Sequence, residues 1–305
     1  MSFGVIVLGN GGGVVTAPTG NTNFAIVPGL DDSAVSDAHL TPDPIGDILS
    51  NFPYWLLDCG PETAIRLCGG TLPHARPLLK NLMGILITHT HTDHTGGLAM
   101  IAWRGHFIEK IRPKLVYAVD CEDMLMQQLV ELHGWASPGL IHALRRAPTL
   151  HDFFDLQCAC PATLTGLGTM MATPREVNHN IFGTINGEFR GFPGVSWGVH
   201  VDDSDTRALF SGDTAVPLPR DLVAAHTATF HDVQFYDDGS PSAVHCPYEE
   251  LAASMPDHVQ RSTVWLSHYT APSWAVSEDG GFRWAQQDTI ITVANGKVTH
   301  ERRPA

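Results

Sequence analysis

Short apolar runs alternate with segments of helical periodicity along the whole chain. Apolar runs bounded by turn residues predict strands at Phe3–Leu8, Asn23–Val27, Trp55–Leu57, Gly84–Ile87, Lys114–Ala118, Ala208–Phe210, Val264–Leu266 and Thr289–Val293. Helical spacing of apolar residues predicts helices at Glu62–Leu67, Gly97–Trp103, Glu122–Leu132 and Tyr248–Met255. Strands that alternate with helices from one end of the chain to the other indicate a layered α/β fold.

Three of the predicted strands lead directly into polar clusters. Gly84–Ile87 precedes THTHTDH, Ala208–Phe210 precedes SGDT, and Val264–Leu266 precedes SHY. Loops at strand ends commonly carry functional side chains, because the scaffold holds them in fixed positions. We therefore expect the functional site in these three loops.

The composition fits a single globular domain spanning residues 1–305, since no internal repeat or linker interrupts the chain. The net charge of −14 disfavours a long nucleic acid as partner, because such binding relies on Lys and Arg contacts to phosphates. The sequence contains no uninterrupted run of eighteen apolar residues, so it predicts no membrane span. The N-terminal segment MSFGVIVLGNGGG lacks the features of a secretory signal.

The six cysteines form no CxxC pair, so we expect reduced thiols in a cytoplasmic protein rather than a disulfide framework. Cys158 and Cys160 form a lone CxC, which is weak evidence for a metal site. The 17 histidines carry more information, because several of them are clustered.

The segment Thr88–Gly97 reads THTHTDHTGG and contains H-x-H-x-D-H. Four potential ligands within six residues converge only if the loop wraps around a common centre. Imidazole nitrogens suit zinc and similar ions, and a carboxylate adds an oxygen ligand. The alternative, a polar loop that is rich in histidine by chance, does not account for the preceding strand and the following glycines.

H-x-H-x-D-H after an apolar strand resembles the signature of the metallo-β-lactamase superfamily. LGNGGG at Leu8–Gly13, WLLDCG at Trp55–Gly60, FSGDT at Phe210–Thr214 and the later WLSHY are similar to the RNase Z-like branch. The resemblance extends from about residue 5 to about residue 270, in the family's order. It implies a four-layer αββα sandwich with the site on loops at one edge, and it suggests a homodimer.

The resemblance also implies a centre of two metal ions, with seven ligands: His89, His91, Asp93, His94, His179, Asp213 and His268. The first two histidines would bind one ion together with a later histidine. The Asp–His pair of the motif would bind the second ion with His268, and Asp213 would bridge the two ions. Zn²⁺ is the expected metal, and Mn²⁺ is an alternative because it accepts the same N and O ligands.

The later histidine is best matched by His179, at the end of TMMATPREVNH and before Asp213. His151 and His200 are the competitors for this position. His200 lies in WGVHV, where alternation predicts a residue on a strand face.

A further candidate is His245, which lies between Asp213 and His268, where RNase Z-like enzymes place a catalytic histidine that assists the leaving group. Its VHCP setting differs from the usual one, so its role stays open. His231 and Asp232 in TFHDVQF would either orient a site residue or form a locally satisfied surface pair.

Paired cations lower the pKa of a bound water from about 15.7 to about 7, which supplies hydroxide at neutral pH. Asp93 and Asp213 would align that hydroxide. The chain has no G-x-S-x-G elbow or P-loop to compete for the role. The sequence therefore predicts a metal-dependent hydrolase.

The RNase Z-like resemblance favours a phosphodiester substrate. However, only 33 residues separate His179 from Asp213, and they read as strand and turn rather than the long arm of tRNA-processing members. We therefore expect a small phosphodiester such as a cyclic nucleotide. The alternatives are a lactone, ester or thioester hydrolase and an RNase Z-type RNA endonuclease.

Two further alternatives are weaker. Seven intact ligands disfavour a non-enzymatic binding protein on the same scaffold, and His91 disfavours a flavin-linked di-iron protein, which has Glu at an early site position. The segment from Arg104 to Ala159 is the expected specificity region. Trp135, Trp197 and Trp274 are candidates for stacking on a base, although tryptophans are more often core residues.

Overall fold

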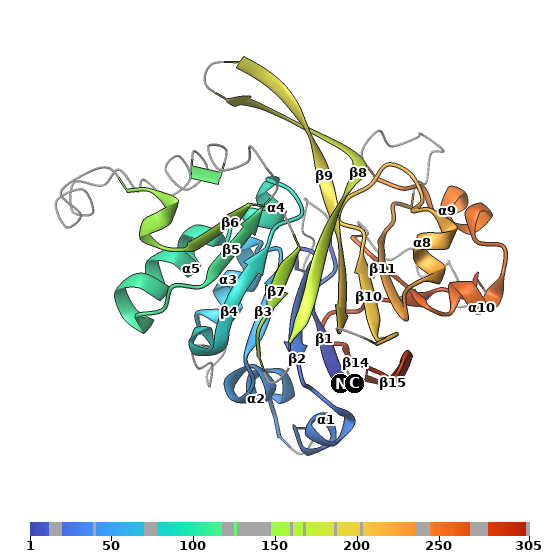
Figure 1. Cartoon of the computed structure of the whole chain (residues 1–305), viewed down its shortest axis with the longest axis horizontal. Helices are drawn as coiled ribbons and strands as arrows, with labels where there is room; N and C mark the ends of the chain where they lie inside the picture. Colours follow the sequence, from blue (N-terminus) through green and yellow to red (C-terminus); the bar gives the residue numbers. More distant parts are fainter. Residues whose placement is uncertain are drawn as a thin grey trace.

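The structure, a computed structural model, describes residues 1–11, 20–38, 41–69, 78–117, 125–126, 148–158, 161–166, 169–185, 188–201, 204–235, 245–268 and 280–302. Within these residues, two β-sheets face each other, with helices on their outer sides (Figure 1). The arrangement is the expected αββα sandwich.

The first sheet has eight strands in the order β15-β14-β1-β2-β3-β4-β5-β6 among the described residues. Their bounds are β1 Ser2–Gly9, β2 Asn23–Pro28, β3 Tyr54–Leu57, β4 Leu82–Leu86, β5 Lys114–Tyr117, β6 Asp155–Cys158, β14 Ile290–Ala294 and β15 Lys297–Arg302. Strands β3 to β6 are parallel, while β14, β1 and β2 are antiparallel to their neighbours.

The second sheet has the order β13-β12-β11-β10-β9-β8-β7 over the described part of the chain. Its strands are β7 Ala162–Leu164, β8 Met170–Ile185, β9 Glu188–Val201, β10 Arg207–Phe210, β11 Ala228–Asp232, β12 Val264–Ser267 and β13 Arg283–Trp284. β10 to β13 run parallel, and β8 and β9 form a long antiparallel hairpin that projects beyond the sheet (Figure 1). The described residues between His179 and Asp213 thus lie mainly in β8, β9 and β10, as expected.

Helices cover the outer faces of both sheets. Those beside the first sheet are α1 Asp32–Ala38, α2 Pro44–Asn51, α3 Pro61–Leu67, α4 Thr92–Thr95 and α5 Leu98–Arg104, and those beside the second are α8 Arg220–Ala224, α9 Tyr248–Ser254 and α10 His258–Arg261. Short helical turns at Leu79–Asn81, Gly105–Glu109 and Leu150–Asp152 complete the described helices. No described helix has the length and apolar character that a membrane span requires.

Three buried clusters hold the layers together. In β1, Phe3, Val5 and Val7 face the second sheet, whereas Ile6 and Leu8 face the helices, because successive side chains of a strand point to opposite sides. The third cluster fills the space between the second sheet and its helices around Leu251. Burial on both faces explains why the sequence shows continuous apolar runs rather than polar alternation.

The predicted elements are confirmed within one or two residues wherever the structure describes them. Several predictions fall outside the described residues: Trp135, Trp274, Cys160 and all of the predicted helix Glu122–Leu132 except residues 125–126. Of the predicted specificity region from Arg104 to Ala159, the structure describes only residues 104–117, 125–126 and 148–158. The proposal that Trp197 stacks on a base is wrong. Its side chain is fully buried between the sheets, and its Nε1 donates a hydrogen bond to the Ile87 carbonyl oxygen at 3.2 Å.

Candidate metal centre

The polar clusters predicted from the sequence meet at one edge of the sandwich. β4 leads into the loop of His89 to His94, β10 leads to Asp213, and β12 leads to His268. The register of β8 and β9 shifts between Val177 and Asn180, at the position of His179. Ends of parallel strands lie at the same edge of a sheet, so residues distant in the sequence come together here.

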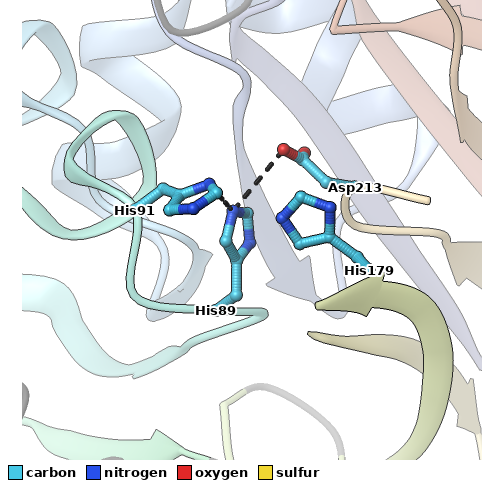
Figure 2. Close-up of side chains that lie close together, drawn as sticks. All are labelled: His89, His91, His179 and Asp213. Atoms are coloured by element: carbon cyan, nitrogen blue, oxygen red, sulfur yellow. Dashed lines mark hydrogen bonds and ion pairs between the residues drawn. The ribbon is translucent and has the colours of Figure 1, made fainter. Parts of the chain in front are cut away.

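Four residues form the first group: His89, His91, His179 and Asp213. Figure 2 shows the three rings and the carboxylate converging, with His89 and His91 on one loop, His179 on β8 and Asp213 on the loop after β10. His89 Nε2 lies 3.0 Å from His91 Nδ1 and 3.5 Å from Asp213 Oδ2. One ligand atom from each residue lies within 4.8 Å of the others, which fits a shared metal ion.

A second group combines Asp93, His94 and His268 with the other oxygen of Asp213. His94 Nε2 lies 3.4 Å from Asp93 Oδ2, 3.3 Å from Asp213 Oδ1 and 3.4 Å from His268 Nε2. His268 Nε2 lies 3.3 Å from Asp93 Oδ2 and 3.4 Å from Asp213 Oδ1. Five of the six separations among these four atoms are therefore nearly equal.

These separations test whether the residues fit a metal ion. The ligand atoms of Asp93, His94 and His268 lie 3.3–3.4 Å from one another and form a nearly equilateral triangle. An ion at a Zn²⁺ bond length of about 2 Å from each atom can contact all three. The nitrogen and oxygen donors also suit such an ion. The residues therefore fit a divalent metal site, and the two oxygens of Asp213 face one group each.

The buried carboxylates of the centre stabilise positive charge on the groups beside them. Burial lowers the pKa of His268, but the carboxylates of Asp213, Asp232 and Asp93 outweigh it and raise this pKa to about 10. Burial likewise opposes the charged form of Asp213, yet the neighbouring histidines hold its pKa well below the usual range. Protons on these rings or a bound cation supply the positive charge, so metal and protons compete for the site.

The net pKa shift of the histidines is opposite in the first group, where burial prevails. Burial lowers the pKa of His89 well below the usual value and also lowers the pKa of His91. Neighbouring histidines add to this effect, while Asp213 opposes it. Neutral imidazole is the form that binds a metal ion, so these two rings are prepared for coordination.

Asp58, which the sequence analysis did not identify as a site residue, contacts the ring of the ligand His94 on the side away from the metal group. It is 3% exposed and directly follows the apolar strand β3. Its carboxylate accepts hydrogen bonds from Thr88 N at 2.8 Å and Thr88 Oγ1 at 2.7 Å, and it lies 2.7 Å from His94 Nδ1. Burial raises the pKa of Asp58, while His94 and the hydrogen bonds oppose that rise. A single acidic residue at the end of an apolar run was the available sequence signal.

Close backbone contacts explain the shape of the histidine loop. Cys59 N donates to the His94 carbonyl oxygen at 2.6 Å, and Gly97 N donates to the Cys59 carbonyl oxygen at 2.8 Å. A Cβ atom on Gly60 would lie 2.3 Å from the Asp93 carbonyl oxygen. Glycine is therefore required at residue 60, and the loop turns into α4 directly against β3.

His245 borders both groups. Its ring centroid lies 4.5 Å from that of His268 and 6.2 Å from that of His179, and its side chain is 19% exposed. His231 and Asp232 are buried, so their interpretation as a surface pair is wrong. His231 Nε2 accepts a hydrogen bond from Leu218 N at 3.1 Å, which links β11 to the segment before α8.

The competing candidates lie in other settings. His151 is exposed in the turn Leu150–Asp152, and His200 pairs with Arg207 across β9 and β10. Cys158 is an exposed free thiol that belongs to neither group, and Cys59, Cys68 and Cys246 are also free. The structure therefore places His179, rather than its two competitors, beside His89 and His91.

Comparisons with known proteins agree with this geometry. The family model described as Anti-Pycsar protein Apyc1 matches residues 50–291. The Anti-Pycsar protein Apyc1 of Bacillus phage BSP38 is 29% identical over 218 residues, which cover 70% of this chain and 77% of that protein.

Solved structures share the fold at low sequence identity. The metallo-β-lactamase fold protein YhfI from Bacillus subtilis is 13% identical, with a TM-score of 0.59 over 94% of this chain and 98% of its own. Unliganded yeast PDE1 is 12% identical, with a TM-score of 0.60 over 95% and 99% of the two chains. The fold is thus that of the metallo-β-lactamases, and the family match extends over most of the chain. This chain belongs to the Anti-Pycsar protein Apyc1 family.

Proposed function

We propose that the chain is a phosphodiesterase that hydrolyses a small cyclic nucleotide at a centre of two divalent metal ions. The observation that carries this proposal is the arrangement of the seven ligand residues as two groups that share Asp213. Members of the Anti-Pycsar protein Apyc1 family degrade cyclic nucleotides, which supports the substrate class.

Each group would hold one ion. His89, His91 and His179 would bind the first, the second would lie among Asp93, His94 and His268, and Asp213 would contribute one oxygen to each. When bound, such ions acidify a water molecule and offset the negative charge of a phosphate. Zn²⁺ is our preferred ion because of the histidine-rich donor set, and Mn²⁺ is the alternative.

The residues of the chain would orient the reactants. The carboxylates of Asp93 and Asp213 accept hydrogen bonds and would align the attacking water against phosphorus. The new bond forms between the water oxygen and phosphorus, the ester P–O bond breaks, and the leaving ribose oxygen gains one proton. His245, whose side chain is 19% exposed, would donate a hydrogen bond to that oxygen. The product is the ring-opened nucleotide, with one water added.

The net charge of the chain favours a small substrate over RNA. The net charge of −14 opposes a long phosphate backbone. Bound cations would dominate the field within the site itself and would attract a single phosphate. We further propose that the chain is one domain, forms a homodimer and acts in the cytoplasm, and light scattering of the purified protein tests the dimer.

The test is hydrolysis of a panel by metal-replete protein, with Asp93→Ala as the inactive variant and the exposed Asp221→Ala as its matched control. The panel contains cyclic mononucleotides, bis(4-nitrophenyl) phosphate, a short RNA, a lactone and a thioester. We expect activity on the cyclic nucleotides that Asp93→Ala abolishes and Asp221→Ala retains. Activity confined to the RNA, or to the lactone or thioester, would contradict the proposal.

A further inference from the structure

Asp232 lies at the centre of the contacts that join three loops of the site. It ends β11 and is 1% exposed. The parallel pairing of β11 with β12 places it opposite Ser267, the residue before His268. Its backbone N–H donates to Ser211 Oγ at 2.8 Å, on the loop that leads to Asp213.

The two carboxylate oxygens of Asp232 have different partners. Oδ2 accepts a hydrogen bond from Thr214 N at 2.9 Å and lies 3.1 Å from His245 Nδ1. Oδ1 lies 3.4 Å from His268 Nδ1. One buried carboxylate thus contacts the residue after Asp213 and the Nδ1 atoms of two histidines.

These contacts favour one ring nitrogen over the other. An ionised carboxylate only accepts hydrogen bonds, so it favours a proton on His245 Nδ1, which lies within hydrogen-bond distance of Oδ2. His268 Nδ1 and Asp232 Oδ1 form an ion-pair contact without hydrogen-bond geometry, and a proton on this nitrogen is favoured because both buried atoms otherwise have no hydrogen-bond partner. In His268 this leaves Nε2 for the second group, where it lies 3.3 Å from Asp93 Oδ2 and 3.4 Å from Asp213 Oδ1. In His245 it directs Nε2 away from Asp232, and a ring with protons on both nitrogens can donate from Nε2. A carboxylate that holds the far nitrogen of a metal-binding histidine both orients the ring and sets its tautomer.

The backbone of His268 strengthens the case. Its φ of +63° lies in the left-handed region, which a residue with a side chain adopts only at an energetic cost. Because Asp232 is buried, water does not readily replace its carboxylate as the partner of these rings. The surroundings must therefore hold His268 in place, and the Asp232 contact is suited to do so.

We propose that Asp232 is a positioning residue for both halves of the centre: it holds His268 for metal binding and His245 for the leaving-group oxygen. The His245 half rests on the proposed phosphodiesterase function, whereas the His268 half requires only metal binding. The alternative is a structural residue that only fixes the backbone of Thr214.

The test compares Asp232→Asn with His245→Ala, the double variant and Asp43→Asn. Asp43 also accepts a backbone N–H, from Gly46 at 3.0 Å, but it caps α2 away from the centre. The readouts are Co²⁺ affinity, the Co²⁺ absorption spectrum, and kcat and KM on a cyclic nucleotide and on bis(4-nitrophenyl) phosphate. The nitrophenolate leaving group needs little assistance, so it isolates the contribution of His245.

We expect Asp232→Asn to weaken Co²⁺ binding by about 10–100-fold and to change the Co²⁺ spectrum, because removal of such a partner has effects of this size. At saturating metal, kcat should fall more on the cyclic nucleotide than on the nitrophenyl diester, with KM nearly unchanged. In the double variant, the asparagine should add little further loss of kcat on the cyclic nucleotide to that of His245→Ala.

Unchanged Co²⁺ affinity and spectrum would overturn the His268 half. Equal losses of kcat on both substrates, or fully additive losses in the double variant, would overturn the His245 half. If the wild-type protein cleaves neither diester, the proposed function and the His245 half fail together, while the Co²⁺ readouts still decide the His268 half.

A measurement on the wild-type protein covers the case in which Asp232→Asn does not fold. Proton–nitrogen correlation spectra of histidine-labelled protein distinguish Nδ1–H from Nε2–H rings. With assignments from single histidine variants, we expect an Nδ1–H in both His245 and His268. Finding the proton only on Nε2 in both rings would overturn the proposal.

Discussion

The substitution Asp58→Asn removes one charge and leaves the shape of the side chain intact, yet it should disturb both metal groups. The carboxylate accepts hydrogen bonds from Thr88 N and Thr88 Oγ1 and contacts His94 Nδ1. Thr88 Oγ1 in turn lies 3.0 Å from His89 Nδ1, so it accepts from that ring while it donates to Asp58. One carboxylate therefore keeps Nε2 available in both histidines.

An asparagine amide at residue 58 reverses the direction of the hydrogen bonds to Thr88 Oγ1 and His94. Its oxygen still accepts from Thr88 N, but its NH₂ group donates toward Thr88 Oγ1 and the His94 ring. Each histidine is then favoured with its proton on Nε2, the nitrogen that faces the metal groups. Two altered hydrogen bonds should cost about 1–3 kcal/mol of folding free energy, which a protein of this size tolerates. Loss of such support should weaken metal binding about 10–100-fold, or about 1.4–2.7 kcal/mol.

The assay is titration of metal-free protein with Zn²⁺ by calorimetry, with urea unfolding of the metal-free protein in parallel. Asp43→Asn is the matched control, because an asparagine also caps a helix, and we expect wild-type Zn²⁺ affinity from it. Wild-type Zn²⁺ affinity in Asp58→Asn would refute the reasoning. A loss of affinity that merely follows a much larger loss of stability would also refute it, since the effect would then be general.

Three further outcomes follow from the geometry. Gly60→Ala should destabilise the protein and weaken metal binding, because the new methyl group meets the Asp93 carbonyl oxygen. The control Gly105→Ala lies in a helical turn and should be tolerated, and urea midpoints and metal content compare the two variants. Phe230→Ala should cost about 3–5 kcal/mol in urea unfolding, since its ring stacks between aromatic rings of neighbouring strands, and a loss below about 1 kcal/mol would contradict this packing. Chelation should lower the Tm of the wild-type protein but leave that of Asp213→Ala nearly unchanged, and equal shifts in scanning calorimetry would contradict a shared metal centre.

The fold was largely predictable because its strands are buried on both faces. Apolar runs such as Phe3–Leu8 have no other stable place than the middle of a layered domain, and the structure confirms them. The order of strands within the sheets was not predictable from these runs. It depends on pairings such as β1 with β14, which join residues almost 290 positions apart in the sequence.

The ligand residues were easier to identify than the residues that support them. H-x-H-x-D-H concentrates four candidates in one loop, so local sequence alone indicates a centre. The choice of His179 over its competitors rested on an expected strand end, which is wrong because His179 lies within β8. A register shift between Val177 and Asn180 marks its position in that strand instead. The predicted roles of the ligands in catalysis await the experiments above.

Asp58 shows why a supporting residue escapes sequence analysis, whereas Asp232 was already a candidate through its pairing with His231 in TFHDVQF. Asp58 directly follows β3 and Asp232 ends β11, so each is a buried carboxylate at the end of a buried strand. Their importance arises only when the strands align and place each carboxylate behind the ring of a histidine. The two residues support opposite sides of the second group, Asp58 through His94 and Asp232 through His268. Substitution of both should therefore weaken the second ion more than the first, although Asp58 also reaches His89 through Thr88.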